Sequence, residues 1–112
     1  MNTLLKPDKK LAWRLLTEVG FDDRITGYKM GKRTGAQPIT MYSFQEVAGF
    51  LSETYPNIDL NKLEKWIDTV MGDQELAGMI REVIKNNQNN RQKITNIRDL
   101  VTYRLIQCKK MI

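Results

Sequence analysis

Apolar residues recur every three or four positions in five stretches of the chain, the spacing that places them along one face of an α-helix. The five stretches cover residues 8–19, 44–55, 60–71, 74–85 and 95–110. In the second stretch the apolar face consists of Phe44, Val47, Ala48, Leu51 and Tyr55. The pattern therefore predicts five amphipathic helices.

Residues that begin or end helices flank these stretches. Side chains able to cap a first turn stand at Asp8, Ser43, Asp59 and Asp73, and residues that end a helix stand at Gly20, Pro56 and Gly72. Glu46, three residues after Ser43, completes a capping box. Because only two residues separate the third stretch from the fourth, these two helices are predicted to form a tight hairpin.

Residues 20–42 break the helical pattern. They contain Gly20, Gly27, Gly31, Gly35 and Pro38, which are too many breakers for a helix. A long irregular loop fits this composition, and so does a short β-hairpin, because Ile25, Tyr28 and Ile39 tolerate strands. We predict the loop, and we expect it to be the most mobile part of the chain away from the ends.

The polar residues 86–93 predict a solvated connector, because asparagine favours turns. The helix predicted after it is apolar on more than one side, so we expect it at the centre of the bundle or, as the alternative, at an oligomer surface. Arg98 and Arg104 border its apolar face and are expected to extend their charges into solvent.

These patterns together predict an all-α fold. It is a single-domain bundle of about five helices over residues 1–112, ordered over about residues 8–110. A long Gly-rich basic loop connects the first two helices. A chain of 112 residues, of which 41% are hydrophobic, is large enough for one core.

The composition excludes several chemistries. The chain has no histidine, which removes most nucleophilic triads and nearly all zinc catalytic sites. Its one cysteine, Cys108, is expected to be a buried and unreactive thiol. Glu64 and Asp68 are one helical turn apart without a third carboxylate, so they predict a solvated acidic face rather than a cation site. We therefore expect a protein that is not an enzyme and needs no cofactor and no metal.

The amino terminus is not expected to act as a signal peptide. The amino terminus has two apolar residues, Leu4 and Leu5, before charged residues resume, which is too few for a signal peptide. No apolar run approaches the roughly 18 residues that cross a bilayer. With one cysteine and no disulfide, the sequence predicts a cytoplasmic protein with no membrane partner.

The net charge of +5 is unevenly distributed. Residues 1–42 carry eight bases and four acids, residues 43–80 carry two bases and seven acids, and residues 81–112 carry eight bases and two acids. The chain therefore has basic ends and an acidic middle. This layout suits a polyanionic partner, and it also suits pairing between chains.

Residues 27–35 combine glycines, cations and an aromatic ring. The cations are Lys29, Lys32 and Arg33, and the ring is Tyr28. Glycines let a backbone approach a phosphate, the cations neutralise its charge, and Tyr28 can stack on a base. The spacing does not match a P-loop. The alternative is a solvated surface loop without a ligand.

A second basic cluster consists of Arg81, Lys85, Arg91 and Lys93. Arg81 and Lys85 are one helical turn apart and share a helix face. The amide side chains between Lys85 and Arg91 can donate hydrogen bonds to phosphate or sugar oxygens. The alternative is a polar connector flanked by ordinary surface bases.

Two functions remain after these exclusions. The first is a small basic helical binding protein that associates with nucleic acid through phosphate-backbone contacts from Tyr28, Lys29, Lys32, Arg33, Arg81, Lys85, Arg91 and Lys93. The second is a protein-interaction or accessory subunit that self-associates or docks on a larger complex without enzymatic activity. The sequence does not choose between DNA and RNA.

Overall fold

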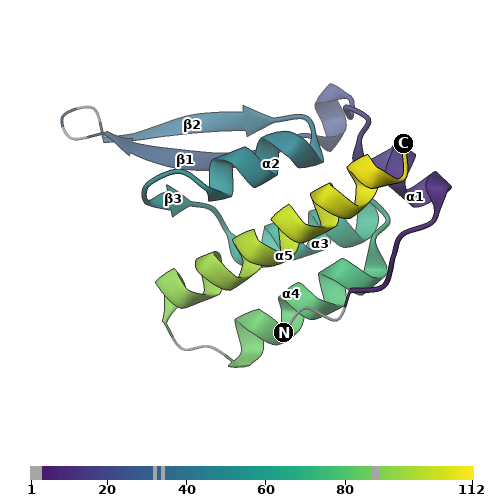
Figure 1. Ribbon diagram of the computed structural model, residues 1–112. Helices are drawn as coiled ribbons and strands as arrows, with labels where there is room; N and C mark the ends of the chain where they lie inside the picture. Colours follow the sequence, from purple (N-terminus) through teal and green to yellow (C-terminus); the bar gives the residue numbers. More distant parts are fainter. Residues whose placement is uncertain (1–3, 32, 34, 87–88) are drawn as a thin grey trace.

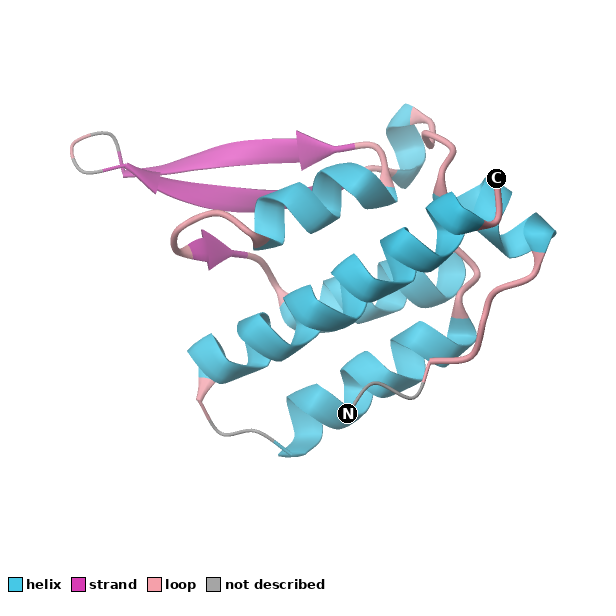
Figure 2. Cartoon of the chain, viewed as in Figure 1, coloured by secondary structure: helices cyan, strands magenta, loops and turns pink. Residues whose placement is uncertain are grey.

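The computed structural model describes residues 4–31, 33, 35–86 and 89–112. In chain order its elements are α1 (Lys9–Leu15), a 3-10 helix η1 (Phe21–Asp23), β1 (Ile25–Gly31), β2 (Gly35–Met41), α2 (Phe44–Leu51), β3 (Pro56–Asn57), α3 (Leu60–Thr69), α4 (Gln74–Asn86) and α5 (Asn90–Lys110). This part of the chain therefore has a mixed α and β fold, with five α-helices and a three-stranded antiparallel sheet (Figure 1, Figure 2).

The prediction of an all-α helical bundle is wrong, because the segment assigned to a long basic loop forms a β-hairpin. β1 and β2 pair in antiparallel register, from Ile25 opposite Met41 to Gly31 opposite Gly35. The short β3 pairs with the other edge of β1, which gives the strand order β2-β1-β3. Gly35 begins β2 with a φ of 71°, a left-handed conformation that glycine adopts without strain. The mobility expected of residues 20–42 assumed an irregular loop, whereas the structure places most of this segment in two paired strands.

The sheet and the helices are arranged in layers. α2 lies along one face of the sheet, and α5, the longest helix, runs below α2 in the view of Figure 1. α5 packs against α1, α2 and α4, while α3 and α4 pack against each other. The central position predicted for the last helix is confirmed.

The core is built from the apolar faces that the periodicity identifies. Its fully buried residues include Phe44, Val47 and Leu51 of α2, Leu63 and Ile67 of α3, Leu76 and Ile80 of α4, and Ile97 and Val101 of α5. Tyr55 is the exception, since it was assigned to the apolar face of the second helix and is exposed. The hydrophobic pattern therefore locates the core in every helix except at the end of α2.

The predicted starts of the first four helices are confirmed. The side chains of Asp8, Ser43, Asp59 and Asp73 each accept a hydrogen bond from a backbone N–H of the following first turn. Glu46 closes the capping box by accepting from the Ser43 hydroxyl and from the Tyr42 N–H. Gly72 lies between α3 and α4 with a φ of 72°, the left-handed conformation expected there.

The first two helices are shorter than predicted. α1 ends at Leu15 rather than at residue 19, and Gly20 has an extended backbone instead of a left-handed one. α2 ends at Leu51 rather than at residue 55. A proline disfavours the helical conformation at the residue before it, so Pro56 prevents the helix from reaching Tyr55.

α5 is longer than predicted, because it begins at Asn90 inside the polar segment assigned to a connector. The Asn89 side chain caps it by accepting hydrogen bonds from the N–H groups of Arg91 and Gln92. The extra first turn places Arg91 on a helix, in a fixed position relative to the rest of α5.

Arg104 is buried, contrary to the prediction that its charge extends into solvent, and it is 1% exposed. Its Nε lies 2.8 Å from Asp73 Oδ2, and its Nη2 donates to Glu75 Oε1 at 2.7 Å. Its Nη1 donates to the Leu5 carbonyl at 2.7 Å. One guanidinium group therefore holds together the N-terminal segment, the start of α4 and the middle of α5.

Gly27 lets α2 approach the sheet closely. A Cβ atom at Gly27 would lie 2.5 Å from Cζ of Phe50, well inside van der Waals contact. Gly27→Ala is therefore expected to displace this ring and to lower the free energy of unfolding by about 1–3 kcal/mol in urea denaturation. The control is Gly49→Ala, which meets nothing within 4 Å and is expected to stabilise α2 by about 0.5–1 kcal/mol. Unchanged stability of Gly27→Ala would show that α2 does not rest on β1.

Candidate functional site

Two hollows flank residues 51–57, which we call the link: it comprises the last residue of α2, the turn that follows and β3. The larger one, which we call the hairpin–α5 groove, has a volume of about 650 Å³. It is lined by Met30 of β1, by Leu51, Glu53, Thr54, Tyr55, Pro56 and Asn57 of the link, and by Asn90, Arg91, Ile94, Thr95 and Arg98 of α5. Figure 1 shows β3 between the hairpin and the N-terminal half of α5, and the residues that line the groove come from these three elements and the rest of the link.

Two arginines of α5 line the hairpin–α5 groove. Arg91 lies in the first turn, and Arg98 follows seven residues later on nearly the same side of the helix, about 10.5 Å further along its axis. Arg98 pairs with Asp99 at 3.2 Å, whereas Arg91 has no ion-pair partner among the residues that the structure describes. The acidic residue that lines the groove is Glu53. The described walls therefore carry more positive than negative charge.

Tyr55 occupies the ridge between the two hollows and lines both of them. Its φ is 59°, and no other non-glycine residue in the described part of the chain has a positive φ. A left-handed backbone is strained for a bulky residue, and such strain tends to gather at functional sites. The side chain is 75% exposed, so the fold gains little from burying the ring.

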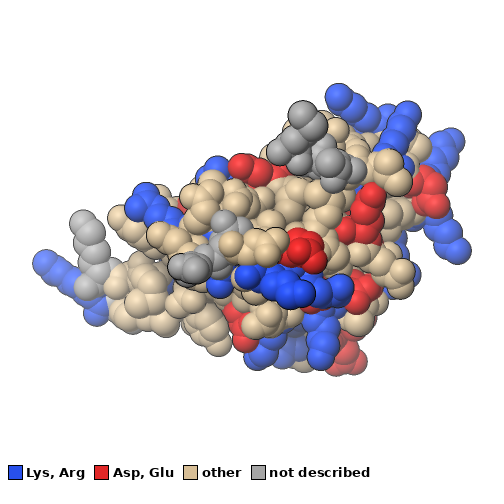
Figure 3. Space-filling model, turned by 90° about the horizontal axis from the view of Figure 1, so that it is seen from below, with Lys and Arg blue, Asp and Glu red and all other residues tan. Residues whose placement is uncertain are grey.

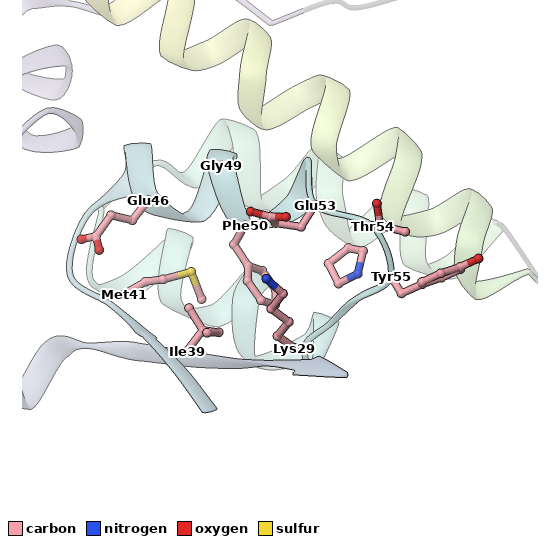
Figure 4. A pocket seen from close by; sticks show the side chains of 10 residues that line it. Lys29, Ile39, Met41, Glu46, Gly49, Phe50, Glu53, Thr54 and Tyr55 are labelled. Atoms are coloured by element: carbon pink, nitrogen blue, oxygen red, sulfur yellow. The ribbon is translucent and has the colours of Figure 1, made fainter. Parts of the chain in front are cut away.

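The smaller hollow, the Phe50 pocket, lies between α2 and the face of the sheet that α2 covers (Figure 4). It has a volume of about 310 Å³, and its apolar lining comes from Ile39, Met41 and Phe50. In Figure 4 the Lys29 side chain extends alongside Phe50, and the Tyr55 ring points away from the pocket. The pocket is therefore mainly an apolar gap beside α2, with Tyr55 directed elsewhere.

The residues predicted on the hairpin do not form one surface. Lys29 faces α2 in the Phe50 pocket, whereas Tyr28 lies on the opposite face, above a hollow that includes Lys62 and Lys65 of α3. The cause is the alternation of side chains along a strand, which separates neighbouring residues onto opposite faces. Arg33 is exposed at the end of the hairpin, and Lys32 lies outside the described residues.

The second predicted cluster is also divided. Arg81 donates to Glu64 through Nε at 3.1 Å and lies 3.9 Å from Asp68, and the hydrogen bond to Glu64 raises its pKa. The acidic pair predicted to be a solvated face is thus the partner of Arg81, on the surface between α3 and α4. Lys85 is exposed near the end of α4, and Lys93 is half-buried on α5 without lining the groove.

Of the predicted residues, Arg91 is the one that lines the hairpin–α5 groove together with a residue of the hairpin, Met30. The sequence interpretation missed Tyr55 and Arg98 as site residues. A signal for Tyr55 was present, because a residue before proline rarely ends a helix, so Tyr55 belonged to the link rather than to the core. The sequence indicated Arg98 less clearly. Its position two helical turns after Arg91 becomes apparent only when α5 begins at Asn90.

The described residues also bear on a reactive thiol, a metal site and a membrane-spanning helix. Burial raises the pKa of Cys108 to about 11, and the predicted burial of this thiol is confirmed. Across the described ranges, no three His, Cys, Asp or Glu residues are grouped so that they would hold a metal ion. None of the described helices combines the length and the apolar composition needed to cross a bilayer.

No protein-family model, no curated protein and no solved structure matches this chain. The function must therefore be inferred from the chemistry of the site.

Proposed function

We propose that this protein binds nucleic acid, without catalysis, through the hairpin–α5 groove and the adjoining end of the hairpin. The observation that carries the proposal is the combination of residues in the groove: two guanidinium groups, the amide side chains of Asn57 and Asn90, and an exposed aromatic ring. Guanidinium and amide groups donate hydrogen bonds to phosphate and sugar oxygens, and an aromatic ring stacks on bases.

Local charges, rather than a surface of one sign, supply the attraction. Figure 3 shows basic and acidic side chains interspersed over the body of the molecule, while the projecting hairpin ends in basic side chains. Arg33 lies exposed at that end, and Arg91 lies in the groove without an acidic partner among the described residues. A ligand that follows both sites meets positive charge at two places, which favours a chain of phosphates over a single anion.

The absence of histidine and the raised pKa of Cys108 support a binding role rather than an enzymatic one. A cytoplasmic location is part of this proposal, since a single buried thiol requires no oxidising compartment.

Arg91→Ala and Arg33→Ala are each expected to weaken binding to every nucleic-acid sequence by a similar factor. Contacts to phosphate carry charge but no base information, so sequence preference should not change. Each lost contact should reduce the slope of log K against log salt by about 0.7–0.9. Fluorescence anisotropy with labelled oligonucleotides over a salt series measures both effects.

The matched control is Arg81→Ala, because Arg81 is engaged with Glu64 on the α3–α4 surface, away from the groove. This variant is expected to bind like the wild type. Equal weakening by Arg81→Ala and Arg91→Ala would point to a diffuse charge effect. Absence of any salt-sensitive binding at micromolar protein would remove the proposal.

A second candidate, an interaction subunit that docks on another protein, is favoured by a separate observation. Within the described part of the chain β2 is an open edge of the sheet, and Tyr28, Met30 and Pro38 are exposed on the face that α2 does not cover. Exposed apolar residues next to an open edge suit pairing with another chain. Size-exclusion chromatography with light scattering separates the two: a stable dimer whose mass is unaffected by oligonucleotides favours this second function.

A further inference from the structure

We propose that the hairpin–α5 groove binds a single strand, DNA or RNA, with an unpaired base stacked on Tyr55 between phosphates held by Arg91 and Arg98. This inference rests on the proposed function, because it names the form of nucleic acid that the same groove takes.

Tyr55 has a backbone conformation that is unusual for a large side chain. Glycine or asparagine would adopt its φ of 59° with less strain, yet the position holds a large aromatic ring. Burial does not explain this choice, since Tyr55 is 75% exposed. The strained turn instead holds an uncovered ring at the edge of the groove, in the position that a stacking partner requires.

The groove beside that ring combines apolar and cationic side chains. Met30 and Ile94 supply apolar surface, and Met30 is 55% exposed. Arg91 and Arg98 stand about two helical turns apart along one wall. A nucleotide has an apolar base face and a charged phosphate on either side of its sugar. The groove offers both kinds of contact, since Ile94 lies between Arg91 and Arg98 along α5, and Tyr55 and Met30 line the same groove.

The exposed ring of Tyr55 favours a single strand over a duplex. In a duplex each base is covered on both faces by its neighbours, so Tyr55 has no face on which to stack. A duplex can still place its phosphates near Arg33 and Arg91, but it leaves the strained aromatic residue without a function. A single strand uses both the arginines and the ring. The sequence preference should be weak, because every base presents a π face.

The test compares Tyr55→Gly with Tyr55→Phe on single-stranded DNA, single-stranded RNA and the matching duplex, by fluorescence anisotropy. Tyr55→Gly removes the ring and relieves the backbone, so its melting temperature should equal or exceed that of the wild type. We expect it to lose about 5- to 150-fold in affinity for both single strands while its weaker duplex binding is unchanged. Tyr55→Phe keeps the stacking surface and is expected to bind like the wild type.

Tyr55→Asn is the second variant, since asparagine also tolerates the left-handed conformation, and it should reproduce the loss seen with Tyr55→Gly. Single-strand binding by Tyr55→Gly at wild-type affinity overturns the stacking inference. If Arg91→Ala still weakens single-strand binding in that case, the proposed function stands and only the stacking on Tyr55 is lost. If the wild type prefers the duplex and the Tyr55 variants bind like the wild type, the stacking inference is overturned and the proposed function stands. Absence of binding to all three ligands overturns the inference and the proposed function together.

Discussion

Replacing Arg104 by alanine is expected to lower the free energy of unfolding by about 3–5 kcal/mol. Arg104 and Asp73 are each 1% exposed, and their charges lie 2.8 Å apart. Removing the arginine leaves the Asp73 carboxylate buried without its partner, and an uncompensated buried charge is strongly destabilising. The variant also loses the hydrogen bond to the Leu5 carbonyl, so the N-terminal segment should lose protection from hydrogen exchange.

The control for this prediction is Arg98→Ala, six residues earlier on the same helix. Arg98 pairs with Asp99 at the surface, and such a pair contributes about 0–1 kcal/mol. Urea denaturation of both variants gives the comparison. A loss below about 1 kcal/mol for Arg104→Ala would contradict the buried network and restore the sequence-based expectation that this side chain reaches solvent.

Phe50→Ala is expected to cost about 3–5 kcal/mol, the range for truncating a buried phenylalanine. Phe50 is 6% exposed, and its ring lies on Gly27, where it joins α2 to the hairpin. Without the ring the hairpin loses this contact with α2, so the β1 and β2 amides should exchange faster than those of α5. Hydrogen exchange measured alongside denaturant unfolding tests both parts.

Gln45→Ala provides the matched control, since Gln45 is exposed on the same helix and its loss should change stability by less than about 0.5 kcal/mol. A double variant adds a sharper test. Gly27→Ala should be less harmful when Phe50 is already alanine, because the overlapping ring is gone. Strict additivity of the two changes would contradict the contact.

The sequence predicts the helical part of the fold well, because each helix has its own local signal. The caps at Ser43 and Asp59 and the turn at Gly72 each depend on a few neighbouring residues, and all three are found. The hairpin has only a weak local signal, the strand-tolerant Ile25, Tyr28 and Ile39, which did not separate it from a loop. Its glycines are explained by a distant contact, that of Gly27 with Phe50, and by the return of the chain at Gly35. From the sequence alone the same glycines suggest an irregular loop.

Arg104 shows a second limit of periodicity. Its angle on the helix lies near the apolar face, but whether a charge there turns outward or inward depends on partners far away in the chain. From the sequence, Asp73 is predicted as a helix cap, and Glu75 lies in the acidic middle of the chain. The structure shows that both reach Arg104 across the interface between α4 and α5.

The candidate site is less accessible to sequence reasoning than the fold. A count of cations selects Arg91, but it selects Arg81 equally, and only the tertiary structure pairs Arg81 with Glu64. Tyr55 looks like a core residue when only spacing is considered. Its exposure follows from the early end of α2 and its positive φ, which depend on how the link turns toward β3.

The most direct test of the central claim is to locate the bound ligand on the protein. Uniformly ¹⁵N-labelled protein is titrated with a single strand of about ten nucleotides, and amide shifts are followed by heteronuclear NMR. We expect the largest changes at Met30 and Arg33, at residues 53–57 and at residues 90–98, with the surface around Arg81 unchanged. Shifts centred on Arg81 or along the open edge of β2, or no shifts at all, would contradict it.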